Sequence, residues 1–274
     1  MRRIFLFLLT VLISTLSHAS QVDTLSIYSN SMKKNLRCVV VTPDGYETSG
    51  RSYPVVYLLH GYSGSFNNWV KKVPYVVTAA DQYQMIIVCP DGAYGSWYFD
   101  SPVDPNMKYE THVAVEVPAF IDDHYKTIKS RYARAITGLS MGGHGGLYLG
   151  WRHSEYFGAC GSMSGAIDIS VIKRGYGMEK LLGDTLLNQK NYEQYSFLHE
   201  METPAKQPMA IILDCGTEDF IVAMSRETHE KMLKLKIRHD YTERPGKHDW
   251  EYWANALQYQ MLYFHNFFEK SREP

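Results

Sequence analysis

The feature that most limits the fold is a regular alternation of short β-branched runs with segments of helical length. Eight runs rich in Val, Ile, Thr and aromatic residues are bounded by turn residues, at 24–28, 36–42, 55–59, 85–88, 135–137, 159–163, 209–213 and 237–242. Strands that alternate with helices are typical of βαβ units, which build a parallel sheet with helices on both faces. The first two runs are separated only by residues 29–35, which favours an antiparallel hairpin at one edge. The sequence therefore predicts an α/β fold with one mostly parallel, eight-stranded sheet.

The segments between these runs predict the helices, at 70–83, 111–125, 141–152, 222–236 and 250–270. Pro118 should kink the second helix or delay its start. Two stretches fit neither pattern: 91–110 is a loop rich in aromatic residues, Gly and Pro, and 167–206 is interpreted as an insertion over one edge of the sheet. Loops this long are usually functional or disordered. Because no linker or repeat divides the chain, residues 20–274 are expected to form one domain.

The N-terminus has the pattern of a secretory signal. Arg2 and Arg3 precede an apolar run at 4–13, and Ser17-His18-Ala19 supplies small residues at both positions that a signal peptidase reads. The run is too short to cross a hydrocarbon core of about 30 Å as a helix, so a stable membrane anchor is not expected. The sequence predicts a signal peptide at 1–19, cut after Ala19, and a periplasmic or secreted protein.

Charge and cysteine content exclude several classes of protein. The chain has 28 Lys and Arg against 29 Asp and Glu, so no basic surplus is present to neutralise phosphates, and no nucleic-acid partner is expected. Its four cysteines are too few and too widely spaced for a disulfide scaffold. Each lies in a predicted strand or at its end, which favours buried core thiols. No metal motif such as HExxH is present, and we expect neither a metal nor another cofactor.

Gly138-Leu139-Ser140-Met141-Gly142 is the first indication of chemistry, because it matches the G-x-S-x-G turn. The predicted strand at 135–137 precedes it and a helix start rich in glycine follows, which is the context this motif requires. The turn needs glycines because it is too tight for Cβ atoms two residues either side of a serine with a strained backbone. We expect Ser140 to be a nucleophile; a purely structural strand–helix turn is the alternative.

A serine nucleophile needs a base, and in this arrangement the chain order is Ser, then Asp or Glu, then His. His229 and His265 fall in predicted helices and His239 falls in a predicted strand, which favours structural roles for all three. His248 lies in the turn between the last strand and the last helix. A catalytic histidine belongs on such a loop, so His248 is the predicted base.

The acid that orients the base has several candidates. Asp214, Glu218 and Asp219 all follow the strand at 209–213. Asp214 continues the strand and is expected to order the turn, whereas Asp219 lies on the loop that leads to the next helix. We assign Asp219, with Glu218 and Asp214 as alternatives and Asp168 as a more remote one.

Two backbone N–H groups are needed to stabilise the oxyanion of a tetrahedral intermediate. Met141, directly after the nucleophile, supplies one. The apolar strand at 55–59 runs into the turn His60-Gly61-Tyr62, so Tyr62 is predicted to supply the other. The His60 side chain precedes the turn and is expected to be structural.

These segments together resemble the esterase D / carbohydrate esterase family 1 group of the α/β-hydrolase superfamily. The similarity covers about residues 23–268 and is carried by the turns at 60–61, 138–143, 215–219 and 246–250. The resemblance implies an α/β-hydrolase fold, the triad Ser140, Asp219 and His248, and the Tyr62 and Met141 amides as the oxyanion hole. It also implies that Glu110 orders the pocket or the structure and is not catalytic. The group includes feruloyl, acetylxylan and tributyrin-type esterases, S-formylglutathione hydrolases and mycolyltransferases.

The substrate is not defined by the resemblance. Tyr94, Trp97 and Tyr98 on the long loop, with Trp250, are predicted to bind a sugar or feruloyl ring, although packing of the loop would explain them equally well. We expect an exported serine esterase that acts on feruloyl or acetyl esters of plant-type carbohydrate, or on small acyl esters. The alternatives are acyl transfer to a carbohydrate acceptor, or a non-catalytic binding protein on a hydrolase scaffold, which the intact triad argues against.

Overall fold

An eight-stranded sheet forms the centre of the computed structural model, which describes residues 20–172 and 175–271. The strand order is β1-β2-β4-β3-β5-β6-β7-β8. β1 and β2 form an antiparallel hairpin at one edge, β2 is also antiparallel to β4, and every other neighbouring pair is parallel. This confirms the predicted mostly parallel sheet. The strands are β1 Gln21–Ser29, β2 Lys34–Thr42, β3 Val55–Leu59, β4 Ile86–Pro90, β5 Arg134–Gly138, β6 Ala159–Met163, β7 Ala210–Gly216 and β8 Asp240–Arg244.

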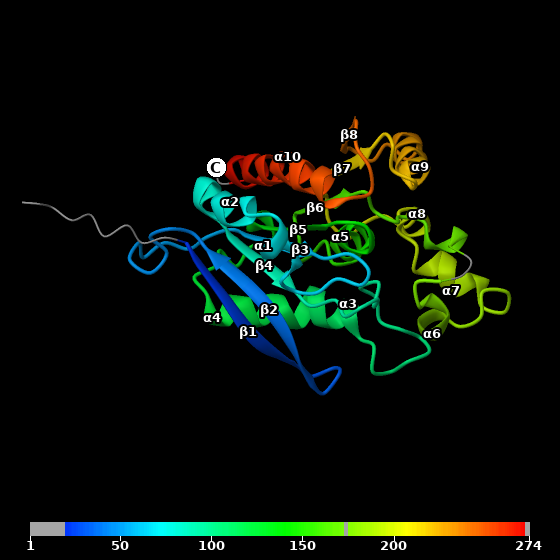
Figure 1. Cartoon of the computed structure of the whole chain (residues 1–274), viewed down its shortest axis with the longest axis horizontal. Coiled ribbons are helices and arrows are strands. Elements are labelled where there is room, and N and C mark those ends of the chain that lie inside the picture. Colours follow the sequence, from blue (N-terminus) through cyan, green and yellow to red (C-terminus); the bar gives the residue numbers. More distant parts are fainter. Residues whose placement is uncertain (1–19, 173–174, 272–274) are drawn as a thin grey trace, which may run out of the picture.

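Helices cover both faces of the sheet, with α2 and α10 above it and α4 below it in Figure 1. Successive β3 side chains alternate between the two cores: Tyr57 and Leu59 face α4, α5 and α9, whereas Val56 and Leu58 face α1, α2 and α10. Both faces are therefore buried, which explains why β3 is apolar throughout. The main helices are α1 Asn68–Lys72, α2 Tyr75–Tyr83, α3 Tyr109–Thr111, α4 Val117–His124, α5 Met141–Arg152, α9 Val222–Lys234 and α10 Trp250–Lys270.

Two predicted helices are interrupted where proline lacks an N–H. The helix expected at 70–83 is two helices, because Pro74 caps α2 and the chain leaves α1 at Val73. The helix expected at 111–125 contains a π-helical turn, His112–Glu116, directly before α4. Pro118 cannot donate the usual bond to the carbonyl four residues earlier, and the wider turn accommodates this.

The last strand begins later than the predicted start at residue 237. Lys236 has φ +58°, and the Ile237 N–H donates to the Met232 carbonyl at 2.9 Å. Residues 235–237 therefore form a left-handed C-cap that ends α9. β8 therefore starts at Asp240.

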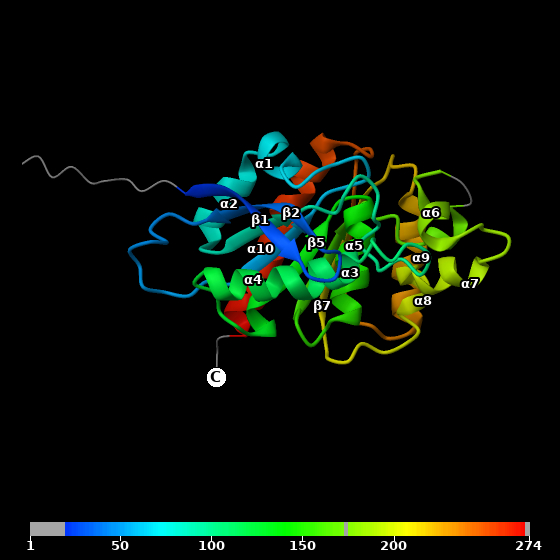
Figure 2. The same cartoon turned by 90° about the horizontal axis from the view of Figure 1, so that it is seen from below.

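The stretch at 167–206 folds into short helices beside α5 and α9, at the right of Figure 1 and again in Figure 2. Its apolar side chains, among them Leu182 and Phe197, belong to the same core as α5. Its elements are a 3₁₀ turn Ile169–Val171, α6 Met178–Leu182, α7 Gln189–Gln194 and α8 Phe197–Glu200.

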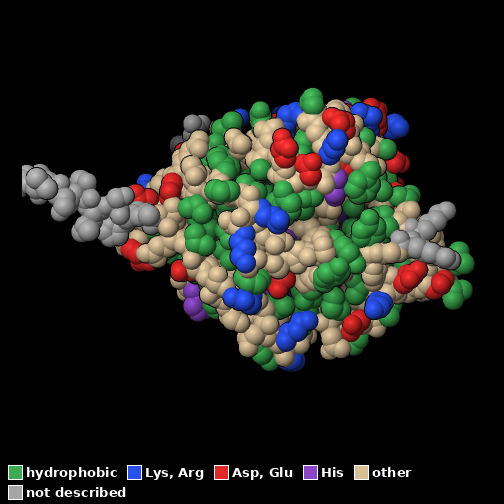
Figure 3. Space-filling model, in the orientation of Figure 1, with side chains coloured by type: hydrophobic (Ala, Val, Ile, Leu, Met, Phe, Trp, Pro, Cys, Tyr) green, Lys and Arg blue, Asp and Glu red, His purple; other side chains and the backbone are tan. Residues whose placement is uncertain are grey.

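The predicted signal peptide, residues 1–19, lies outside the described residues. Among the helices that are described, none combines the length and apolar character needed to cross a membrane. Acidic and basic side chains are interspersed on the face shown in Figure 3, with hydrophobic side chains between them.

Candidate active site

The Gly-x-Ser-x-Gly motif lies at a tight turn between β5 and α5. Ser140 separates the two elements with φ 53° and ψ −116°, a backbone conformation that non-glycine residues rarely adopt. A Cβ on Gly138 would lie 2.6 Å from the carbonyl oxygens of Gly142 and Leu59. A Cβ on Gly142 would lie equally close to the carbonyls of Leu59 and His60. The two glycines therefore allow α5 to start directly against the end of β3.

Three predicted residues form a hydrogen-bonded chain at the carboxyl edge of the sheet. His248 Nε2 lies 2.9 Å from Ser140 Oγ, and His248 Nδ1 lies 2.8 Å from Asp219 Oδ2. A carboxylate can only accept, so Nδ1 donates, and Nε2 of a neutral imidazole is left to accept from the serine hydroxyl. This arrangement can withdraw a proton from Ser140.

Asp219 is held as a carboxylate in a buried position. Its side chain is 0% exposed, and it accepts from the Ile221 N–H at 3.0 Å as well as from His248. Burial alone would raise the pKa of Asp219, but the hydrogen bonds from His248, Ile221 and Ser164 outweigh burial and hold the pKa below its usual range. Asp219 is therefore ionised, as it must be to accept the Nδ1–H of His248 and orient the imidazole.

The other candidate acids have other partners. Asp214 is buried and accepts from the Tyr252 hydroxyl and the Arg244 guanidinium, and burial raises its pKa above the usual range. Glu218 is exposed and lies 4.0 Å from Lys247. Asp168 accepts from the backbone and hydroxyl of Ser170. Of the four candidate acids, all of which the structure describes, only Asp219 is hydrogen-bonded to His248.

Two backbone amides close to Ser140 have no hydrogen-bond partner among the described residues. Neither the Tyr62 N–H nor the Met141 N–H donates a hydrogen bond to any of the described residues. Met141 is the first residue of α5, where the N–H groups lack partners within the helix. A Cβ on Gly61, directly before Tyr62, would lie 3.4 Å from the Ser140 Cβ, so the two turns are adjacent.

A cleft of about 800 Å³ opens over Ser140 and His248. Of the predicted substrate-binding residues, Trp97 and Trp250 line it. Other lining residues were not predicted, because they come from segments with no motif of their own; they include Lys72, Ile172, Tyr176, Phe220, Met224 and Trp253. Apart from Lys72, these residues share only an apolar or aromatic character, and this does not distinguish them from residues of the core.

The prediction that Tyr98 binds substrate is wrong. Tyr98 is 0% exposed, belongs to the core below the sheet, and donates its hydroxyl to the His60 carbonyl at 3.0 Å. Tyr94 is 65% exposed but does not line the cleft; its ring packs on Tyr62, with centroids 5.0 Å apart. The long loop therefore contacts the cleft through Trp97 and supports it through Tyr94 and Tyr98.

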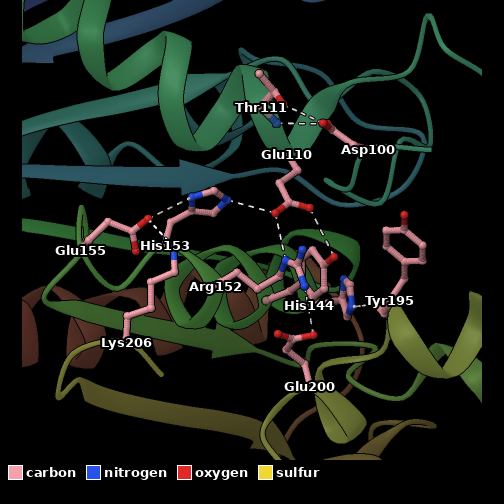
Figure 4. Close-up of polar contacts among 11 residues, drawn as sticks. Asp100, Glu110, Thr111, His144, Arg152, His153, Glu155, Tyr195, Glu200 and Lys206 are labelled. Carbon is pink, nitrogen blue, oxygen red and sulfur yellow. Dashed lines mark hydrogen bonds and ion pairs between the residues drawn. The ribbon is translucent and has the colours of Figure 1, made fainter. Parts of the chain in front are cut away.

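Glu110 is the centre of a polar network at the C-terminal end of α5, shown in Figure 4. Its carboxylate accepts from Arg152 Nε at 2.9 Å, from His153 Nε2 at 3.0 Å and from the Tyr148 hydroxyl at 3.3 Å. Arg152 also donates to Glu200 of α8 at 3.1 Å. Glu110 thus connects the long loop, α5 and the insertion.

We expect Glu110→Gln to destabilise the protein by about 2 kcal/mol, because charge-assisted hydrogen bonds contribute about 1.5–3 kcal/mol each. Burial alone would raise the pKa of Glu110, but His153 and Arg152 hold it below its usual range. A lowered carboxyl pKa stabilises the fold above the unfolded value of about 4.3 and this stabilisation is lost as pH falls through the folded value. Thermal melts should therefore separate wild type from variant at pH 7 and converge as the pH falls through the lowered pKa of Glu110. A difference that grows on acidification would contradict this.

No group of three or more His, Cys, Asp or Glu side chains within residues 20–172 and 175–271 is arranged to hold a metal ion. The four cysteines, all in this part of the chain, are buried free thiols. Burial raises the pKa of the Cys215 thiol to about 11, so it is not a nucleophile at neutral pH.

Fold and site together define an α/β hydrolase of the serine esterase class, a carboxylic ester hydrolase. Comparison with known families agrees: the chain belongs to the esterase family described as "Putative esterase", whose family model matches residues 29–264.

The names of individual relatives state different activities. The chain is 24% identical to an acetyl esterase of Caldicellulosiruptor saccharolyticus, over 86% of this chain and 96% of that one. A solved ferulic acid esterase is 30% identical, with a TM-score of 0.78 over 92% of this chain and 99% of that one. The diacylglycerol acyltransferase/mycolyltransferase Ag85A of Mycobacterium tuberculosis is 27% identical over 71% of this chain, and the match spans 56% of its own length.

Proposed function

We propose that this chain is an exported serine esterase that hydrolyses feruloyl or acetyl esters of carbohydrate through an acyl-enzyme on Ser140. The observation that carries the proposal is the hydrogen-bonded chain from Asp219 through His248 to Ser140 at the base of the cleft. In this mechanism, His248 takes the Ser140 proton as Oγ attacks the ester carbonyl, and then protonates the leaving alkoxide. The Tyr62 and Met141 amides stabilise the oxyanion. Water repeats the cycle on the acyl-enzyme.

The lining of the cleft supports an uncharged substrate with a flat ring. Tyr176 and Trp250 present aromatic surface, whereas Trp97 lines the cleft but is only 2% exposed. A volume of about 800 Å³ is ample for a feruloyl group. Lys72 and Asp249 are the lining residues with full charges, and Asp249 is occupied as the N-cap of α10. The names of the ferulic acid and acetyl esterase relatives point to the same class of substrate.

The ring-binding role is tested with Tyr176→Ala and Trp250→Ala. We expect each to lower kcat/KM for methyl ferulate by about tenfold and for methyl acetate by less than about threefold, because methyl acetate has no ring to stack on either side chain. The matched control is Leu186→Ala, a substitution in the same insertion as Tyr176 at a side chain that is 88% exposed and outside the cleft. Equal losses on both substrates would contradict a specific aromatic subsite.

Export is proposed on the pattern of residues 1–19 alone. Expression of the full chain in a bacterial host should yield a mature protein whose first residue is Ser20, recovered from the periplasm or medium. A protein that keeps Met1 and stays with the cytosolic fraction would contradict export.

Acyl transfer is the second candidate, favoured by the similarity to the mycolyltransferase Ag85A. It is distinguished by product analysis with methyl ferulate and an added sugar acceptor. Feruloylated sugar as the main product would favour transfer, and ferulate alone would favour hydrolysis.

A further inference from the structure

We infer that the loop after β4 positions the oxyanion hole, with His60 and Tyr98 as its positioning residues. The inference rests on the proposed function, because it takes the Tyr62 N–H as an oxyanion donor. The turns after β3 and β4 lie at the same edge of the sheet, since these two strands pair in parallel. Residues 91–98 therefore lie beside the turn at 60–64, and their contacts decide how that turn is oriented.

The His60 ring carries its proton on Nδ1. Its Nε2 accepts the Gly92 N–H at 2.8 Å, which is closer than the Asp91 carboxylate oxygen at 3.4 Å. Nε2 is therefore unprotonated in this arrangement. The proton of the neutral ring is then on Nδ1, which lies 2.9 Å from the Gly61 carbonyl and donates to it. His60 is 1% exposed, so water does not compete for these contacts.

The carbonyl that His60 holds belongs to the peptide unit that contains the Tyr62 N–H. The Gly64 N–H donates to the same Gly61 oxygen at 3.0 Å, which gives this oxygen two donors. In a trans peptide the C=O and N–H point in opposite directions, so fixing the Gly61 oxygen fixes the Tyr62 N–H. The N–H is thereby aimed away from His60 and left without a partner among the described residues.

The same loop holds the turn at two further points. Ser63 has φ +59°, a conformation that glycine or asparagine usually supplies at the third position of a turn, and its N–H donates to the Tyr94 carbonyl at 2.7 Å. The Tyr98 hydroxyl donates to the His60 carbonyl at 3.0 Å. A Cβ on Gly92 would lie 2.4 Å from the Tyr98 ring, so the loop is packed too closely to shift independently of Tyr98.

Two substitutions at His60 separate the two functions of its ring. Asparagine places an amide N–H where Nδ1 is and can still donate to the Gly61 carbonyl; glutamine places an acceptor where Nε2 is and loses that donor. We expect His60→Asn to keep kcat within about tenfold of wild type and His60→Gln to lower it by about 30- to 100-fold, approaching the cost of losing an oxyanion donor. KM should stay within about twofold, because the ground-state ester makes little use of the oxyanion hole.

Tyr98→Phe removes one hydroxyl and should lower kcat by about three- to tenfold. Its matched control is Tyr263→Phe, because the Tyr263 hydroxyl donates to the Ile211 carbonyl at 3.1 Å, far from the turn. The second readout is inhibition by a trifluoromethyl ketone, whose tetrahedral adduct places an oxyanion in the hole. Its Ki should rise in proportion to the loss of kcat/KM in the His60 and Tyr98 variants only.

The outcomes are distinct. The positioning role is overturned, and the proposed function stands, if Ser140→Ala is inactive and the paired variants do not differ in kcat. The pairs are His60→Gln with His60→Asn, and Tyr98→Phe with Tyr263→Phe; equal kcat in either pair is sufficient. If Ser140→Ala retains activity, the proposed function itself fails. Should a His60 variant fail to fold, Tyr98→Phe with the inhibitor decides alone.

Discussion

Replacement of Ser140 by alanine is expected to lower kcat for p-nitrophenyl acetate by about 10⁴- to 10⁶-fold, the range seen when a serine nucleophile is removed. The reason is that covalent catalysis has no substitute at this position: His248 Nε2 is hydrogen-bonded to Ser140 Oγ at 2.9 Å and, among the described residues, to no other side chain. Steady-state hydrolysis measured by p-nitrophenol release gives the result directly.

Loss of fold is the competing explanation for an inactive Ser140→Ala variant. The Ser140 hydroxyl accepts no capping hydrogen bond from the first backbone N–H groups of α5, so we expect the thermal midpoint to stay close to that of wild type. Ser130→Ala is a suitable control for the effect of a serine-to-alanine change outside the cleft, since Ser130 caps a short 3₁₀ turn away from the site. An active Ser140→Ala protein would refute the proposed mechanism.

Asp219→Asn is expected to lower kcat by about 10⁴-fold, the loss produced by the wrong histidine tautomer in related triads. The neutral amide can donate to His248 Nδ1, which moves the imidazole proton to Nε2 and leaves no acceptor for the Ser140 hydroxyl. In the wild type, hydrogen bonds from His248, Ile221 and Ser164 hold the pKa of Asp219 below its usual range, although burial opposes them. The acid therefore stays ionised in mildly acidic solution.

Glu218→Gln is the matched control for Asp219→Asn, because it makes the same chemical change one residue earlier in the same loop. Glu218 is exposed and 4.0 Å from Lys247, so its loss should leave kcat within about twofold of wild type. Kinetics on the two variants under identical conditions decide between the two carboxylates. A larger loss for Glu218→Gln than for Asp219→Asn would reassign the acid.

Much of the sheet was predictable, since alternation and strand length are local properties. β3, β6, α5 and α10 have the predicted bounds. The errors in the helices and in β8 occur where the backbone deviates from regular periodicity: at Pro74, at the π-helical turn before Pro118, and at Lys236, whose left-handed conformation ends α9. Nothing in the sequence around Lys236 predicts that this lysine adopts a left-handed conformation. Other strands are also longer than predicted; for example, β1 is Gln21–Ser29 against 24–28, and β7 is Ala210–Gly216 against 209–213.

The site was predictable in part for a similar reason. Ser140, Asp219 and His248 each follow a strand, and parallel strands bring their carboxyl ends together at one edge, so order along the chain was informative. Trp97 and Trp250 were predicted to line the cleft, but Ile172 and Tyr176 were not, because they reach the cleft only through the packing of the insertion. Tyr98 was misassigned because aromatic character on a loop does not distinguish a ring that binds a ligand from one that supports the backbone.

The most direct test of the central claim is active-site labelling with a fluorophosphonate probe, followed by tryptic mass spectrometry. Cleavage after Arg134 and Arg152 releases a peptide, 135–152, in which Ser140 is the only serine. The proposed mechanism predicts one adduct per chain, on Ser140, with loss of esterase activity in step with labelling and no adduct in Ser140→Ala. Full esterase activity in a protein labelled on Ser140, or inactivation with the adduct on another residue, would contradict it.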